Sequence, residues 1–178
     1  MFTFELYVLR FQVTLRSCLL AYLAMSISSI QAGRVICDLS GWKASNLRMQ
    51  KLLYIAHMLY TGTSNKIEKY LIREDFEAWK YGPVEPELYY FCCDFGADPI
   101  SDVFPYHDTK NENKPEYDIL KKVVGWAKNK SEKYLVGYTH WEHGAWVKRD
   151  SSRKEVIPYE MIKEEYNIRK AMANAKSN

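Results

Sequence analysis

Hydrophobic residues recur at three- and four-residue spacing along most of the chain, which is the period of an amphipathic helix. This pattern predicts helices over residues 26–40, 46–62, 86–95, 120–130, 131–138 and 158–175. The helix over 46–62 is expected at the centre of the core. Two short runs, 70–72 and 76–80, favour strands joined as a hairpin through 73–75. We therefore expect a mainly α fold, a compact multi-helix domain with a small β-hairpin.

The segment Phe76–Pro86 (FEAWKYGPVEP) interrupts the helical pattern with two prolines and a glycine. Such residues make a poor helix but a good short strand that ends in a rigid corner. The corner would hold Trp79 and Tyr81 in one fixed arrangement. Together with Trp141 and Trp146 they could form a protein-binding patch, or the two aromatic segments could pack on each other as core.

Two further regions depart from the amphipathic helical pattern. Residues 1–24 alternate and then become apolar, but Arg10 and Arg16 make them a poor transmembrane helix or secretory signal. They are an extension of uncertain status, and Met25 could be the true start. Residues 97–116 contain three prolines and are expected to form an exposed loop, with Ile100 and Phe104 pinned to the body.

At the other end of the chain, we expect the last helix to place an apolar edge, which includes Met172 and Ala175, against the body. Its charged residues, among them Glu165 and Arg169, are expected to face solvent.

Charge and cysteine content narrow the possible functions. The net charge of +3 comes from 25 basic and 22 acidic residues spread along the chain, so nucleic acid is not the default partner. The densest basic patch, over residues 148–154, is read as a solvated loop. Four cysteines without a C-x-x-C pair suit a reduced, cytoplasmic protein without a cysteine zinc site, and Cys92 is expected in the core.

Catalytic motifs are absent: the chain has no GxSxG elbow, Walker-type loop, GxGxxG or HExxH. One constellation of metal-binding residue types exists, His140, Glu142 and His143, although Gly144 makes a regular helix there doubtful. The two histidines could share a metal, with the carboxylate as a ligand or a base, but the spacing suggests no additional ligand. We therefore expect no enzyme, no cofactor and no metal, and we read His140 as bonded to a backbone group or a buried carboxylate.

Three segments carry a specific resemblance, in this order: residues 46–56 (NLRMQKLLYIA), 76–96 (FEAWKYGPVEPELYYFCCDFG) and 138–146 with its Tyr-Thr-His and Gly-Ala-Trp. Together they resemble the Panacea domain family, the SocA- and GepA-like antitoxins often described as phage-associated proteins. The resemblance runs from about Met25 to Tyr166, and residues 1–24 have no counterpart in it.

The resemblance implies a small, mainly helical domain over 25–178 that neutralises a cognate toxin by binding it, either by binding alone or as an adaptor for a protease complex. The motif residues that match are Gln50, Lys51, Tyr54, Glu77, Trp79, Tyr81, Gly82, Pro83, Val84, Pro86, Thr139, His140 and Trp146. Ala145 stands where the family usually has proline, which puts the rigidity of the second loop in question. Two alternatives stay open: a metal-dependent enzyme using His140, Glu142 and His143, and a nucleic-acid-binding autoregulator.

Overall fold

The computed structural model describes residues 26–63, 69–105 and 114–177. Its elements, in chain order, are α2 (Ser29–Ser40), α3 (Asn46–Gly62), β1 (Phe76–Trp79), β2 (Gly82–Val84), α4 (Pro86–Phe91), the 3-10 turn η1 (Cys93–Phe95), α5 (Pro115–Ala127), α6 (Glu132–Thr139), the 3-10 turn η2 (Trp146–Lys148), β3 (Val156–Ile157) and α7 (Tyr159–Ser177). The mainly α fold with a small antiparallel sheet is thereby confirmed. The interpretation of residues 1–24 lies outside the described residues.

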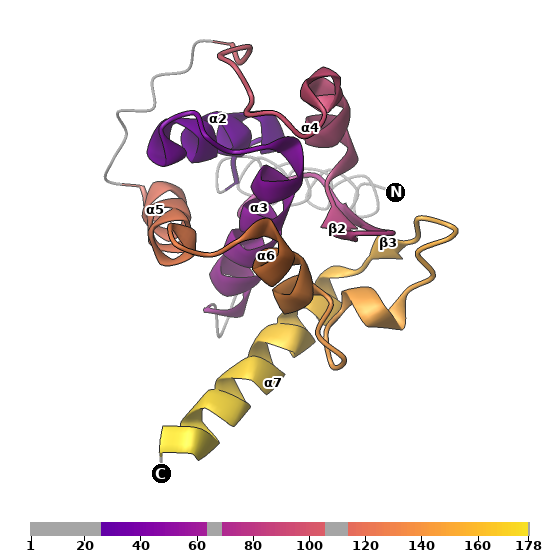
Figure 1. Cartoon of the computed structure of the whole chain (residues 1–178). Coiled ribbons are helices and arrows are strands. Elements are labelled where there is room, and N and C mark those ends of the chain that lie inside the picture. The colour runs from indigo at the N-terminus through magenta and orange to yellow at the C-terminus, as the bar shows by residue number, and fades with distance from the viewer. Residues whose placement is uncertain (1–25, 64–68, 106–113, 178) are drawn as a thin grey trace, which may run out of the picture.

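Helix α3 is the centre of the fold, as its pattern predicted. It packs against α2, α5, α6 and α7 (Figure 1) and is buried around most of its circumference. Ser45 begins the helix by accepting a hydrogen bond from the amide of Arg48 at 3.1 Å. Because so little of α3 faces solvent, polar residues on it, such as Gln50 and Lys51, are buried with the apolar ones and need partners inside the protein.

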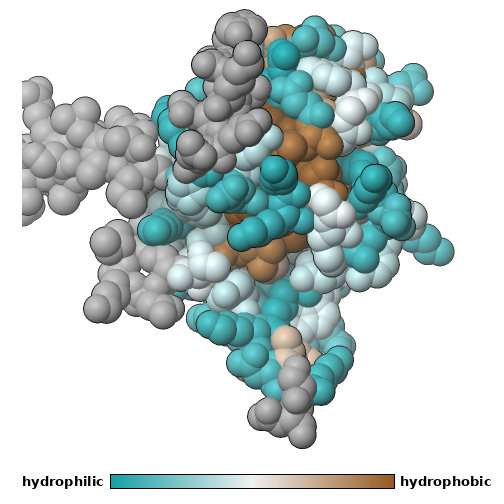
Figure 2. All heavy atoms as spheres, turned by 90° about the vertical axis from the view of Figure 1, so that its left-hand side faces the viewer, coloured by the Kyte–Doolittle hydropathy of each residue, from teal (hydrophilic) through white to brown (hydrophobic). Residues whose placement is uncertain are grey.

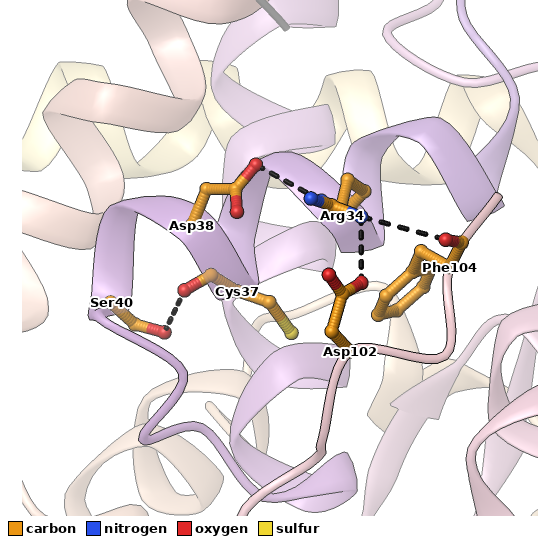
Figure 3. Close-up of polar contacts among 6 residues, drawn as sticks. All are labelled: Arg34, Cys37, Asp38, Ser40, Asp102 and Phe104. Atoms are coloured by element: carbon orange, nitrogen blue, oxygen red, sulfur yellow. Dashed lines mark hydrogen bonds and ion pairs between the residues drawn. The ribbon is translucent and has the colours of Figure 1, made fainter. Parts of the chain in front are cut away.

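The segment that follows α4 is pinned to α2, as expected for Ile100 and Phe104, which are both buried. Arg34 of α2 makes the polar attachment (Figure 3): its guanidinium lies 2.7 Å from Asp102 Oδ1 and 3.5 Å from the carbonyl oxygen of Phe104. The same guanidinium pairs with Asp38 one turn further along α2. On the face that carries α2 and α5, hydrophobic residues gather in a band framed by hydrophilic ones (Figure 2).

The sheet differs from the prediction. Strand β1 pairs with β2 in the register Trp79↔Gly82 on one side, and with β3 in the register Phe76↔Ile157 on the other, so the strand order is β2-β1-β3. Residues 70–72 form no strand of this hairpin, and Ile72 makes only an isolated bridge to Ile27. The turn instead lies inside the corner segment, where glycine allows the chain to reverse.

Helix α4 is shorter than its apolar spacing predicted. It ends at Phe91, because Cys92 leaves the helical region with φ −113° and ψ 10°. Leu88 and Cys92 are fully buried, which confirms the core role of Cys92, but Phe91 is 41% exposed. The predicted face therefore does not continue as one α-helix through residue 95, although Phe95, in the 3-10 turn η1, still packs against the core.

Helix α7 also corrects the sequence interpretation. Ile162 supplies its buried apolar contact, whereas Met172 and Ala175 of the predicted apolar edge are exposed. The C-terminal half of α7 extends away from the body (Figure 1). Glu165, expected in solvent, is 1% exposed. Among the described residues, no helix combines the length and hydrophobicity needed to cross a bilayer.

Candidate functional site

The family-like motif residues converge where α3 meets the β1–β2 turn. Lys51 is fully buried on α3, and its Nζ donates a hydrogen bond to the carbonyl oxygen of Pro83 at 2.8 Å. Burial lowers the pKa of Lys51 to about 7, because desolvation penalises the charged form. This lysine therefore joins α3 to the corner as a buried hydrogen-bond donor.

Gln50 makes a second attachment of α3 to the corner. Its Nε2 donates to the carbonyl oxygen of Glu85 at 3.2 Å, and its Oε1 accepts from the amide of Glu85 at 2.8 Å. The Glu85 carboxylate in turn accepts from the amides of Glu87 and Leu88, so it caps α4. Burial raises the pKa of this carboxyl. Glu85 was missed in the sequence, although its place directly before Pro86 was a signal for a helix cap.

Gly82 is the point of closest approach in the corner. Its φ of +100° belongs to a region that side chains rarely adopt. A methyl group on Gly82 would also lie 2.9 Å from Thr139 Oγ1 and 3.0 Å from Lys51 Nζ. Glycine is required here for both backbone and space, because α6 and α3 press on the turn from two sides.

The second aromatic segment packs directly on the corner. The His140 and Trp146 rings stack with centroids 3.8 Å apart and an interplanar angle of 6°. Trp146 Nε1 donates to the carbonyl oxygen of Trp79 at 2.8 Å, and Trp79 Nε1 donates to Glu77 Oε2 at 2.7 Å. The pKa of His140 is lowered first by burial and then by the neighbouring Lys51 charge. For His140 and Trp146, the structure therefore supports packing as part of the body.

Tyr54 belongs to a buried polar network that the sequence analysis did not find. Its hydroxyl donates to Glu165 Oε2 at 2.7 Å, and the amide of Ala145 donates to the same oxygen at 2.8 Å. Arg169 neutralises the carboxylate with N–O distances of 2.7 and 2.9 Å to Glu165 Oε1. Burial, followed by the Glu165 charge, raises the pKa of Tyr54 well above its usual range. The four-residue spacing of Glu165 and Arg169 was the available signal.

The residues of the metal-binding alternative are not arranged to share a metal ion. His140 is held in its stack with Trp146, whereas His143 and Glu142 lie on the surface, with side chains 55% and 82% exposed. Over residues 26–63, 69–105 and 114–177, no group of three or more histidine, cysteine or acidic side chains is placed to hold a metal ion. The three residues therefore do not form a ligand set.

On the outer side of the corner lies a pocket of about 410 Å³. Trp79, Tyr81 and Tyr89 supply its aromatic lining, and Asn46 and Gln50 supply polar side chains. The Trp79 and Tyr89 ring centroids are 4.8 Å apart, and Tyr81 is 60% exposed. Gln50 bonds Glu85, and Asn46 Nδ2 donates to the carbonyl oxygen of Tyr89, but Asn46 Oδ1 has no partner in the described part of the chain. Lys80 also borders the pocket, which therefore offers aromatic surface together with a few polar groups.

Comparison with known proteins shows the family to which this chain belongs. The family described as "Antitoxin SocA-like, Panacea domain" matches residues 49–147, which cover α3 to η2. The chain belongs to this family. The Antitoxin SocA of Caulobacter vibrioides (strain NA1000 / CB15N) is 47% identical over 45 residues, an alignment that covers 25% of this chain and 22% of that protein. No solved structure matches the chain.

The motif residues predicted from the sequence fall into two groups in this structure. Most are buried attachments between α3, the corner and α6, and Lys51, Gly82 and Thr139 meet at one point. Trp79 is half-buried and Tyr81 is exposed, and both line the pocket. The aromatic pair is therefore one part of the motif that a partner can reach.

Proposed function

We propose that this protein is an antitoxin that neutralises a cognate toxin in the cytoplasm by binding it directly. The observation that carries the proposal is the match of residues 49–147 to a family of SocA-like antitoxins. Membership of this family suggests a non-enzymatic role. The buried motif agrees with that role, because Gln50 and Lys51 use their polar groups on the hairpin.

Co-expression tests the proposal. The product of the neighbouring gene is induced in a bacterial host, with and without this chain, and growth and co-purification are measured. The proposal expects growth arrest by the neighbour alone, and rescue together with a stable complex when both are present. A neighbour that is harmless, or that never co-purifies with this chain, would overturn it.

The accessible aromatic residues separate a contact role from a folding role. Tyr81→Ala removes a side chain that is 60% exposed, so the variant is expected to fold. If the pocket contacts the toxin, Tyr81→Ala loses rescue while its melting temperature stays near that of the wild type. Met172→Ala is a control, because it truncates a side chain that is 44% exposed and lies on α7, outside the pocket.

Neutralisation could also proceed by delivery of the toxin to a protease, as an adaptor would perform it. A host that lacks its cytoplasmic unfoldase proteases separates the two forms of the proposal. Rescue that persists in this host supports simple occlusion, whereas rescue that is lost while the complex still forms supports delivery.

A further inference from the structure

A second accessible aromatic surface lies on α5 and α6, away from the pocket. Lys130, in the turn between these helices, places its Nζ 4.8 Å from the ring centroids of both Trp126 and Tyr134. The Trp126 ring also lies 5.2 Å from that of Tyr138. We call these four residues the lysine–aromatic strip. Its Trp126 and Tyr134 are 41% and 48% exposed, so a partner can reach them.

Hydrogen bonds from Arg48 and the helix cap at Ser131 hold the strip in place. Arg48 of α3 donates to the carbonyl oxygens of Ala127 and Lys130 at 2.6 and 2.7 Å, which closes the C-terminal end of α5. Ser131 caps α6 by accepting from the amide of Tyr134. Aromatic side chains fixed in this way lose little conformational entropy when a partner covers them.

The charge around the strip is mainly positive. From Ile119 to Trp141 the chain carries five lysines and a single carboxylate, Glu132. Glu132 accepts a hydrogen bond from Ser45, at the first turn of α3. The four other lysines are all exposed: Lys121, Lys122, Lys128 and Lys133. The charge balance of the whole chain hides this local excess, which favours an acidic partner.

We propose that the lysine–aromatic strip docks an acidic protein segment, which, on the proposed function, belongs to the toxin. Carboxylates of that segment pair with Lys130 and the surrounding lysines, and its apolar side chains cover Trp126. Single-stranded nucleic acid fits less well, because the Lys130 ammonium already lies over the ring faces on which bases would stack.

The test uses the full chain and the purified product of the neighbouring gene. Titration calorimetry compares wild type with Trp126→Ala and Lys130→Glu at low and high salt. Each variant is expected to weaken binding by about tenfold or more at low salt. The loss in Lys130→Glu shrinks as salt rises, because screening removes the attraction in the wild type.

Lys170→Glu is the matched control. It makes the same change in net charge and also alters a lysine beside a tyrosine ring, Tyr166 at 5.9 Å, but it lies on α7. Its affinity for the neighbour's product should equal that of the wild type. Circular dichroism melts confirm that all three variants are folded.

The outcomes separate the two proposals. Unchanged affinity of folded Trp126→Ala and Lys130→Glu overturns the strip as a docking site and leaves the antitoxin proposal standing. Absence of binding by the wild type overturns both. A labelled 20-nucleotide single strand and the promoter duplex are titrated in parallel. Binding to either that is lost in Lys130→Glu, with affinity for the neighbour's product retained, assigns the strip to nucleic acid instead.

Discussion

Lys51 provides a direct test of how tightly the corner is closed. Its pKa falls from 10.5 to about 7 in the folded protein, because α3 and the hairpin exclude water from the ammonium. Between these two values the unfolded chain holds a proton that the folded chain has lost. The free energy of unfolding must therefore rise with pH across this interval. Below the folded pKa, both states are protonated and the cost of burying the charge is fully present.

With these pKa values, Lys51 raises the free energy of unfolding by about 2 kcal/mol between about pH 6.5 and about pH 8.5. Lys51→Met keeps the length of the side chain and removes the titration. Urea unfolding followed by tryptophan fluorescence, at several pH values, gives the difference between the two proteins. Other titrating groups are shared and largely cancel. If the two stability curves run parallel across this interval, the amine titrates as it would in water, and the reasoning from burial is refuted.

Three further substitutions, two of them with a matched control variant, test contacts of the corner and of α3 and α7, each by its melting temperature and urea midpoint. Gly82→Ala should lower the free energy of unfolding by about 2 kcal/mol or more, whereas Gly125→Ala, in an open position on α5, should raise it by about 0.5–1 kcal/mol. Glu165→Gln leaves the half-buried Arg169 guanidinium without its charge partner and should cost about 3 kcal/mol, whereas the exposed Glu164→Gln should change stability by less than about 0.5 kcal/mol. Arg48→Met removes two hydrogen bonds to the end of α5 and should cost about 2 kcal/mol. Equal stability within either matched pair would contradict the assigned contacts.

The sequence predicted the helices well because their signals are local. Ser45 and Gly41 mark a helix start and a helix end by their own conformational preferences, and the structure places them at these positions. The core role of α3 also followed from the period of its apolar residues. The resemblance to the antitoxin family rested on these same local segments, and the family match confirms it.

The missed features depend on contacts between distant segments. Nothing near residue 76 shows that β1 pairs with β3 eighty residues later, and the strand propensity of residues 70–72 favoured the wrong partner. Glu165 shows the same limit, because a carboxylate on an otherwise polar helix is normally solvated. It is buried only because Tyr54, the Ala145 amide and Arg169 surround it. The packing of the fold thus overrode a correct local preference.

The division of the motif into buried and accessible residues bears on how, on the proposed function, this protein would recognise its toxin. Lys51, Gly82 and Thr139 meet inside the protein, so substitutions there change the fold before they change a contact. A partner can instead reach the pocket beside Tyr81 and the strip around Lys130, which are both attached to the first turns of α3. Side chains on such surfaces can vary without loss of the core. On the proposed function, the shared motif therefore supports the scaffold, and specificity for a toxin arises from the residues that border it.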